Sequence, residues 1–164
     1  MFAATDVQYL AGGGARAALV LADTATFTHI TAETTVLVPE VAPYQPGEFF
    51  RRELPPLRTV LEDSLSGMKL LIVDGYVDLD PSGKPGLGAH AHAEFGVPVI
   101  GVAKTRFATA THAVPVVRGQ SGKPLFITAA GLPVENAAAL VRSMSGNYRL
   151  PDALRRVDQL ARGR

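Results

Sequence analysis

The sequence predicts a mixed α/β fold in one domain that spans residues 1–164. Hydrophobic residues make up 47% of the chain and charged residues 19%, so a chain of this length can bury a core without covalent links. Short apolar and β-branched runs dominate the first part, whereas later strand-length runs alternate with helical periodicity. This alternation is typical of a sheet covered by helices.

The first 38 residues predict an antiparallel meander of short strands. The extended runs are Phe2–Tyr9, Ala15–Leu21, Phe27–Ile30 and Thr34–Val38. Three consecutive glycines, Gly12 to Gly14, mark the first turn. A proline-rich loop at Pro39–Gly47 follows, because each proline removes a backbone donor and restrains its predecessor.

The rest of the chain predicts alternating helices and strands. Apolar residues recur at near-helical spacing in Glu48–Leu65 despite Pro55 and Pro56. Beyond this helix the expected strands are Lys69–Val73, Val97–Val102 and Pro124–Thr128, and the expected helices are Ala89–Phe95, Val134–Met144 and Pro151–Leu160. Residues 76–89 form a Gly/Pro/Asp-rich loop, long enough to favour a functional role over mere connection.

Composition excludes several classes of protein. The chain has no cysteine, which removes disulfides, zinc–cysteine sites and thiol chemistry and fits a reducing, cytoplasmic location. No apolar run approaches the 18 residues of a membrane span, and the first residues lack the pattern of a signal peptide. We therefore expect no membrane partner.

Charge is unevenly distributed along the chain. Residues 1–50 hold one basic and five acidic side chains (−4), residues 51–99 hold five and seven (−2), and residues 100–164 hold ten and three (+7). An acidic first part and a basic last part suggest a cation site and a surface for an anionic partner. The alternative is a set of solvated arginines.

Polar residues at the ends of the predicted strands are the candidates for chemistry. Asp6 lies in the first strand, Asp74 ends an apolar strand, and Lys104 follows another. Ligands of open α/β sheets bind beyond the carboxyl ends of the strands. With the helical Glu53, the two aspartates could form an all-oxygen site for Mg²⁺ or Mn²⁺. Taken singly, each acid also fits a structural role.

These residues lie in segments that resemble the endonuclease V family. The segments, in chain order, are Thr5-Asp6-Val7-Gln8-Tyr9, Pro43-Tyr44-Gln45-Pro46-Gly47, Arg52-Glu53, Val73-Asp74-Gly75, Gly86-Leu87-Gly88-Ala89-His90, Pro98 to Lys104, Lys123-Pro124 to Gly131, and Arg149-Leu150-Pro151 with Arg155 and Asp158. They cover essentially the whole chain in the family's order and spacing. A lone Val-Asp-Gly would carry little weight.

The resemblance implies a ribonuclease H-like fold with a mixed central sheet flanked by helices. It also implies metal-dependent cleavage of DNA or RNA near a deaminated purine such as inosine, at the second phosphodiester bond on the 3′ side, in DNA repair or RNA processing. The partner would be a nucleic acid containing deaminated bases. Mg²⁺, or alternatively Mn²⁺, would be the cofactor.

The resemblance also assigns roles to single residues. The expected catalytic set is Asp6, Glu53, Asp74 and Lys104. The expected metal ligands by resemblance are Asp6, Glu53 and Asp74. Asp80 of the following loop, which departs from the family pattern, is expected to add a carboxylate to them. The expected nucleic-acid-binding residues are Pro43, Tyr44, Gln45 and Pro46, a wedge that enters the duplex, together with Gly86 and His90.

The chain departs from the family pattern at three places. Leu132 stands where the family has a histidine that the resemblance counts in the catalytic set, and Asp80 and Ser82 replace a histidine and an arginine. The chain also begins almost at its first strand, without the family's N-terminal helical extension. Two interpretations follow: a working nuclease in which Asp78 or Asp80 compensates, or a relative that binds nucleic acid without cutting it. A structural subunit with a vestigial acidic pocket is a third hypothesis.

Overall fold

A seven-stranded mixed sheet organises the molecule, in the order β3-β2-β1-β4-β5-β7-β6. The computed structural model describes residues 1–46 and 48–164, so Gly47 of the expected proline-rich loop lies outside the described residues. The strands are β1 (Phe2–Tyr9), β2 (Ala15–Ala22), β3 (Ile30–Val38), β4 (Leu70–Asp74), β5 (Val99–Ala103), β6 (Val114–Val116) and β7 (Leu125–Ala130). The helices are α1 (Phe50–Leu61), which runs into a short 3₁₀ turn at Glu62–Ser64, α2 (Leu87–Phe95), α3 (Val134–Ser143) and α4 (Asp152–Ala161).

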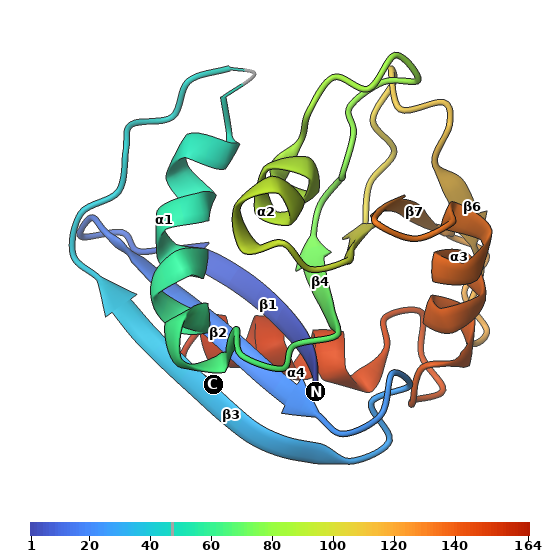
Figure 1. Cartoon of the computed structure of the whole chain (residues 1–164), viewed down its shortest axis with the longest axis horizontal. Coiled ribbons are helices and arrows are strands. Elements are labelled where there is room, and N and C mark those ends of the chain that lie inside the picture. The colour runs from blue at the N-terminus through green and yellow to red at the C-terminus, as the bar shows by residue number, and fades with distance from the viewer. Residues whose placement is uncertain (47) are drawn as a thin grey trace.

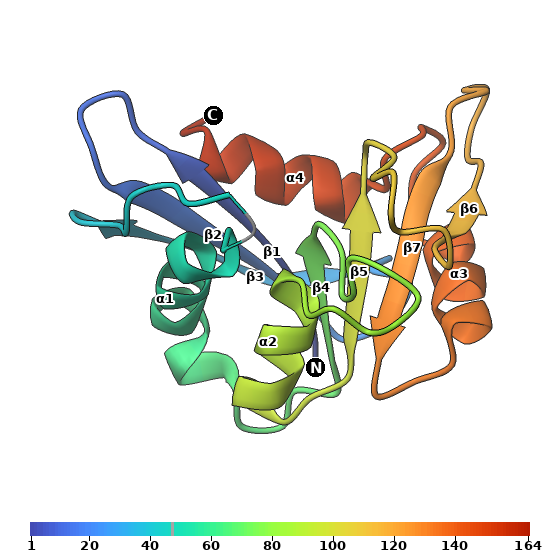
Figure 2. The same cartoon turned by 90° about the horizontal axis from the view of Figure 1, so that it is seen from above.

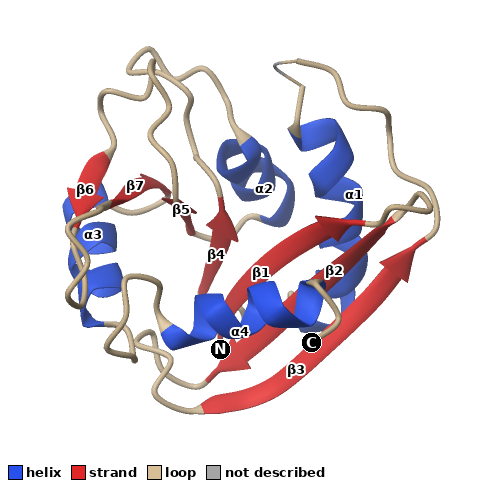
Figure 3. Ribbon diagram, turned by 180° about the vertical axis from the view of Figure 1, so that it is seen from behind, coloured by secondary structure: helices blue, strands red, loops and turns tan. Residues whose placement is uncertain are grey.

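The helices cover both faces of the sheet. Helices α1 and α2 lie on one face and α3 and α4 on the other, as Figures 1 and 2 show, and α4 runs across β1 and β2 (Figure 3). Successive strand residues point to opposite faces, so Ala3 packs with α1 and α2 while Ala4 packs with α3 and α4. No helix among the described residues is long and apolar enough to cross a membrane.

The central strands bring distant residues to one edge of the sheet. Strands β1, β4 and β5 are parallel neighbours, with Thr5 opposite Val73 and Asp74 opposite Val102. Strand β7 runs antiparallel to β5 and pairs Phe126 with Ala103, so its first residues lie at this same edge. The carboxyl ends of β1, β4 and β5 therefore meet where the sequence predicts chemistry.

The structure confirms the mixed α/β fold and corrects some element boundaries. One long strand, β3, replaces the expected runs Phe27–Ile30 and Thr34–Val38 and pairs with β2 along its length. Phe27 itself is buried in the turn before it, with φ of 54°. Strand β6 was not predicted, because three residues that include a proline carry almost no pattern.

Candidate active site

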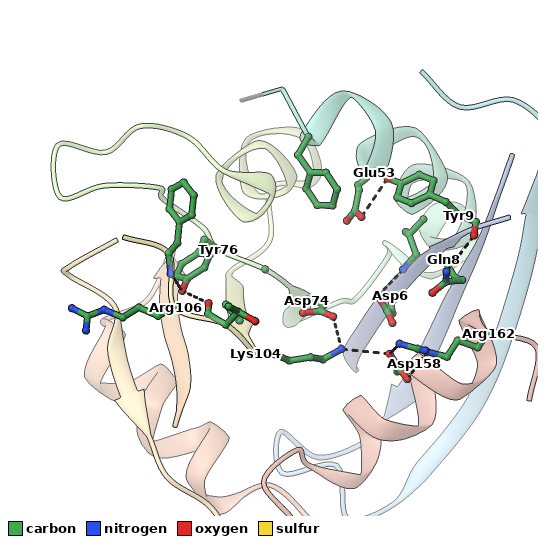
Figure 4. Close-up of a pocket in the computed structure, with 16 residues that line it drawn as sticks. Asp6, Gln8, Tyr9, Glu53, Asp74, Tyr76, Lys104, Arg106, Asp158 and Arg162 are labelled. Atoms are coloured by element: carbon green, nitrogen blue, oxygen red, sulfur yellow. Dashed lines mark hydrogen bonds and ion pairs between the residues drawn. The ribbon is translucent and has the colours of Figure 1, made fainter. Parts of the chain in front are cut away.

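The largest group of candidate residues lines a single pocket of about 640 Å³ at the carboxyl edge of the sheet. Its walls include the four residues expected to be catalytic, Asp6, Glu53, Asp74 and Lys104. Figure 4 shows their side chains around a common space. The four come from β1, α1, the end of β4 and the residue after β5, so only the fold brings them together.

Strand register places the two aspartates side by side. Thr5 is paired with Val73, so the next residues, Asp6 and Asp74, extend from neighbouring parallel strands at the same level. The chain after Asp74 then passes directly over β5 at Gly101. A Cβ at Gly101 would lie only 2.6 Å from the carbonyl oxygen of Gly75 and 2.8 Å from the amide nitrogen of Val77. Glycine at this position therefore lets the segment after Asp74 sit against β5.

Glu53 enters the pocket from the first turn of α1. Its side chain is buried, and the Tyr9 hydroxyl donates to Glu53 Oε1 at 3.3 Å. The guanidinium of Arg52 stacks over the Tyr9 ring, 3.8 Å from the centroid. Burial, and then the charge of Glu53, raise the pKa of the Tyr9 phenol, so it stays protonated and remains a donor. Tyr9 thus orients Glu53 toward the pocket.

Lys104 links two carboxylates on the other side of the pocket. Its Nζ donates to Asp74 Oδ2 at 2.7 Å and to Asp158 Oδ1 at 3.4 Å. Asp158 also pairs at 3.0 Å with Arg162, the residue directly after α4. Burial alone would lower the pKa of Lys104, but the charge and hydrogen bond of Asp74 outweigh it and raise that pKa. Burial likewise opposes ionisation of Asp158, yet Arg162 and Lys104 lower its pKa.

Asp6 and Glu53 are in a different electrostatic state. Burial, followed by repulsion from Asp74, raises the pKa of Asp6 to about 7. Burial, followed by repulsion from Asp6 and Asp74, raises the pKa of Glu53 to about 8. No ion pair within 4.0 Å involves either carboxylate among the described residues. Ionising these two groups therefore costs free energy, and a bound cation would lower that cost.

The carboxylates of the main pocket suit a hard divalent cation, although they do not converge closely enough to share one ion. Carboxylate oxygens are the ligands that Mg²⁺ and Mn²⁺ prefer, and Asp6, Glu53 and Asp74 supply them from three elements. Within residues 1–46 and 48–164, no three metal-binding side chains are close enough to hold an ion as they stand. The ion pair of Asp74 with Lys104 and the hydrogen bond of Glu53 with Tyr9 hold two of these carboxylates at the pocket walls.

A second, smaller pocket of about 220 Å³ adjoins the first. The two share Phe49, Gly75, Tyr76 and Phe107 as walls. Two of the expected nucleic-acid-binding residues, Tyr44 and Gly86, line the smaller pocket, and Tyr44 is 61% exposed. Pro43, Gln45 and Pro46 are exposed on the same loop, whereas His90 stacks on Phe50 with ring centroids 3.6 Å apart.

The Tyr76 hydroxyl forms hydrogen bonds that connect two segments lining this smaller pocket. It donates to the Thr105 carbonyl at 2.7 Å and accepts from the Phe107 amide at 2.9 Å. Gly86 approaches the backbone of the same segment so closely that a Cβ would lie 2.7 Å from the Tyr76 carbonyl oxygen. The pocket is thus shaped by hydrogen bonds from the Tyr76 side chain to the segment after β5 and by the close approach of Gly86 to the backbone of Tyr76.

Two residues that were weighed from the sequence lie outside the main pocket. Asp80 does not line it: its Oδ1 accepts from the Ser82 amide, the Ser82 hydroxyl and the Lys84 amide and so stabilises its own loop. Those hydrogen bonds, the Ser82 hydroxyl first, lower the pKa of Asp80. Leu132 packs against the apolar core. It follows β7, and the last residue of β7 pairs with Val99 at the amino end of β5. It therefore sits at the edge of the sheet opposite the pocket.

The sequence interpretation gave no role to Asp158, which the structure places in the main pocket. The available signal was its position on α4, directly after Val157 on the buried stripe of Ala153, Leu154, Val157 and Ala161. The role of Tyr9 was also missed, since positioning a carboxylate has no motif of its own. Arg162 was expected either to contact phosphate or to be solvated, and the structure pairs it with Asp158.

The family model described as endonuclease V matches residues 1–121. The chain belongs to the endonuclease V family. Endonuclease V of Azotobacter vinelandii is 34% identical over 183 residues, which cover 98% of this chain and 81% of that protein. Endonuclease V of Streptomyces avermitilis is 32% identical over 166 residues, which cover 89% of this chain and 72% of that protein. Relatives of this kind indicate a nuclease.

Solved endonuclease V structures share the architecture. The crystal structure of the Streptomyces avermitilis protein has a TM-score of 0.80 and 29% identity, covering 99% of this chain and 79% of that one. The Ciona intestinalis protein, solved with a 23mer DNA containing an inosine followed by a ribo-adenosine, has a TM-score of 0.83 at 18% identity, covering 99% and 83%. The ribonuclease H-like fold expected from the sequence is confirmed.

Proposed function

We propose that this endonuclease V relative is a metal-dependent endonuclease that cuts DNA or RNA on the 3′ side of a deaminated purine such as inosine. The observation that carries the proposal is the convergence of Asp6, Glu53, Asp74 and Lys104 from four separate elements on one pocket. The inosine-containing DNA bound to the Ciona protein supports the substrate class.

The pocket combines the groups that phosphodiester hydrolysis needs. Asp6, Glu53 and Asp74 would hold the divalent ion, which supplies an activated water and a counter-charge for the reacting phosphate. Lys104 presents an ammonium group fixed by Asp74 and Asp158, so its charge is positioned before any substrate arrives. Tyr9 holds Glu53 in place through its phenol.

The smaller pocket would take the lesion base. A base must leave the stack before its edge can be read, and a deaminated, poorly paired base is cheaper to extrude by about a few kcal/mol. The pocket opens directly beside the catalytic groups and has aromatic walls in Tyr44, Tyr76 and Phe107. The exposed prolines and Tyr44 of the preceding loop would fill the gap that the extruded base leaves.

Cleavage of a lesion-containing strand tests the proposal. The protein is incubated with Mg²⁺, and in parallel with Mn²⁺, on an inosine-containing oligonucleotide and on an unmodified one, as DNA and as RNA. We expect one cut on the 3′ side of inosine, none with EDTA, and a loss of about 1000-fold for Asp74→Asn, equivalent to about 4 kcal/mol of activation free energy. Asp63→Asn, an exposed acid beyond α1, is the matched control and should cut at the wild-type rate.

Three other results would contradict the proposed function. An Asp74→Asn variant that cuts like wild type would refute the assignment of this pocket. Salt-sensitive binding of nucleic acid without any cutting in either metal would instead identify a non-catalytic binding protein. Absence of both metal binding and nucleic-acid binding would leave the fold in a structural role.

A further inference from the structure

A groove of about 650 Å³ lies beside the active pocket, between the loop after β6 and the connection from α3 to α4. Its walls include Gln120, Asn147, Tyr148, Arg149 and Arg155. Leu150 borders both this groove and the small cavity whose other walls include Asp6, Asp74 and Lys104. The groove therefore continues the catalytic edge of the sheet on the side away from the lesion-base pocket.

Tyr148 presents an open aromatic face in this groove. The residue is 62% exposed, and the Arg155 guanidinium covers one side of its ring at 4.4 Å from the centroid. The backbone beneath it is fixed, because Arg118 donates to the carbonyl oxygens of Tyr148 at 3.0 Å and Gly146 at 2.9 Å. An exposed ring on a rigid backbone, backed by a guanidinium, is a platform on which a flat π system can stack.

The charge of the groove is positive. Arg149 lines the groove, donates to the backbone carbonyls of Lys104, Lys123 and Pro124, and pairs with no carboxylate within 4.0 Å among the described residues. Arg155, the other arginine that lines the groove, has Asp152 as an acidic neighbour at 3.6 Å. None of the described residues that line the groove is acidic. A ligand that combines an aromatic base with a phosphate fits this set.

We propose that this groove binds an unpaired nucleotide of the strand being cut, outside the lesion, with its base on Tyr148 and its phosphate near Arg149 and Arg155. The inference rests on the proposed function, because it takes the direction of the strand from the active pocket. Stacking on an aromatic ring needs a base that is free of its partner strand. The nucleotide that occupies the groove therefore belongs to an unpaired flank of the lesion.

Fluorescence anisotropy with end-labelled single-stranded oligonucleotides tests the groove. Binding is measured in EDTA and in Ca²⁺, with and without inosine in the strand. We expect Tyr148→Ala to weaken binding about 5-fold to 150-fold, the range for one base stacked on one aromatic side chain, and Tyr148→Phe to stay within about 2-fold of wild type. Arg155→Ala should weaken binding, whereas Arg156→Ala, the next arginine on α4, which pairs with Glu33 instead, should not.

A length series separates stacking from a structural defect. Oligonucleotides are shortened one nucleotide at a time from each end relative to the inosine. The difference between wild type and Tyr148→Ala should vanish once the nucleotide that occupies the groove is removed from one end. Equal binding of the two proteins at every length, a deficit that persists at every length, or no binding of any oligonucleotide by wild type would overturn the inference. Loss of cleavage alone, with Tyr148-dependent binding retained, would count against the proposed nuclease and not against the groove.

Discussion

The two sides of the active pocket differ in how their charges are balanced. On one side, Lys104 and Arg162 pair with Asp74 and Asp158 over 2.7 to 3.4 Å, and the pKa of Asp158 is lowered. On the other, Asp6 and Glu53 have raised pKa values and no ion pair within 4.0 Å among the described residues. The carboxylates on the Lys104 side are paired with cationic side chains, whereas those on the side of Asp6 and Glu53 are not.

This difference suggests that the two sides of the pocket bind different groups. The side of Asp6 and Glu53 is where a cation would relieve the repulsion, so it is the expected metal side. The side of Lys104 already holds its cation and is the expected phosphate side. Asp74 belongs to both, since it pairs with Lys104 while its charge raises the pKa of Asp6 and of Glu53.

Removing the charge of Glu53 should have the largest effect on metal binding and on cleavage. Glu53→Gln keeps the shape and can still accept from Tyr9, but it takes away one of two unpaired carboxylates. We expect cleavage of inosine-containing DNA to fall about 1000-fold, equivalent to about 4 kcal/mol of activation free energy, and the affinity for Mn²⁺ to fall with it. Single-turnover cleavage and calorimetric titration with Mn²⁺ measure the two effects.

Two variants serve as references for Glu53→Gln. Glu62→Gln, an exposed acid directly after α1, should leave both measurements unchanged. Lys104→Gln should slow cleavage while Mn²⁺ still binds, because it acts on the phosphate side. Equal loss of metal affinity in Glu53→Gln and Lys104→Gln would show that the pocket has no separate metal side.

The next largest effect is the change in stability with pH that Asp6 and Glu53 cause. The pKa values of Asp6 and Glu53 are raised to about 7 and about 8, so the folded protein holds two protons that the unfolded chain releases near pH 4. Their contribution to stability is therefore present below about pH 4 and is lost as pH rises through 7 and 8. In EDTA we expect the Tm of wild type to fall between pH 5 and pH 8.5 by a few degrees more than that of Asp6→Asn, since about 1 kcal/mol shifts Tm by about 2–4 °C at this size.

Divalent ions should cancel that pH effect. Bound Mg²⁺ or Mn²⁺ requires the carboxylates in their ionised form, so its stabilisation grows as pH rises through the same range. Differential scanning calorimetry with and without the metal measures both trends. Identical slopes for wild type and Asp6→Asn in EDTA would show that Asp6 does not hold its proton in the folded state.

The sequence predicted those parts of the site that follow from pattern and position on a strand. Asp74 and Lys104 could be found because one ends an apolar strand and the other follows one, and Asp6 because it is the single acid within the first strand. Parallel register does bring these positions together. Asp158 could not be found in this way, because a helix crossing the back of the sheet places its residues by packing, which one sequence does not encode locally. The state of Lys104 depends on the same packing, since Asp158 is one of its two partners.

A residue at the far end of the sheet should have the smallest effect of all. Leu132 occupies the place of a histidine expected in the catalytic set, but it follows β7, which runs antiparallel to β5 and ends beside Val99. Because the side chain packs against the core at the edge opposite the pocket, Leu132→His introduces a polar group there and brings none to the reacting phosphate. We expect no gain in the rate of cleavage and a lower Tm, measured by single-turnover assay and thermal melting. A clear gain in rate would mean that the carboxyl ends of the strands are not the whole of the active site.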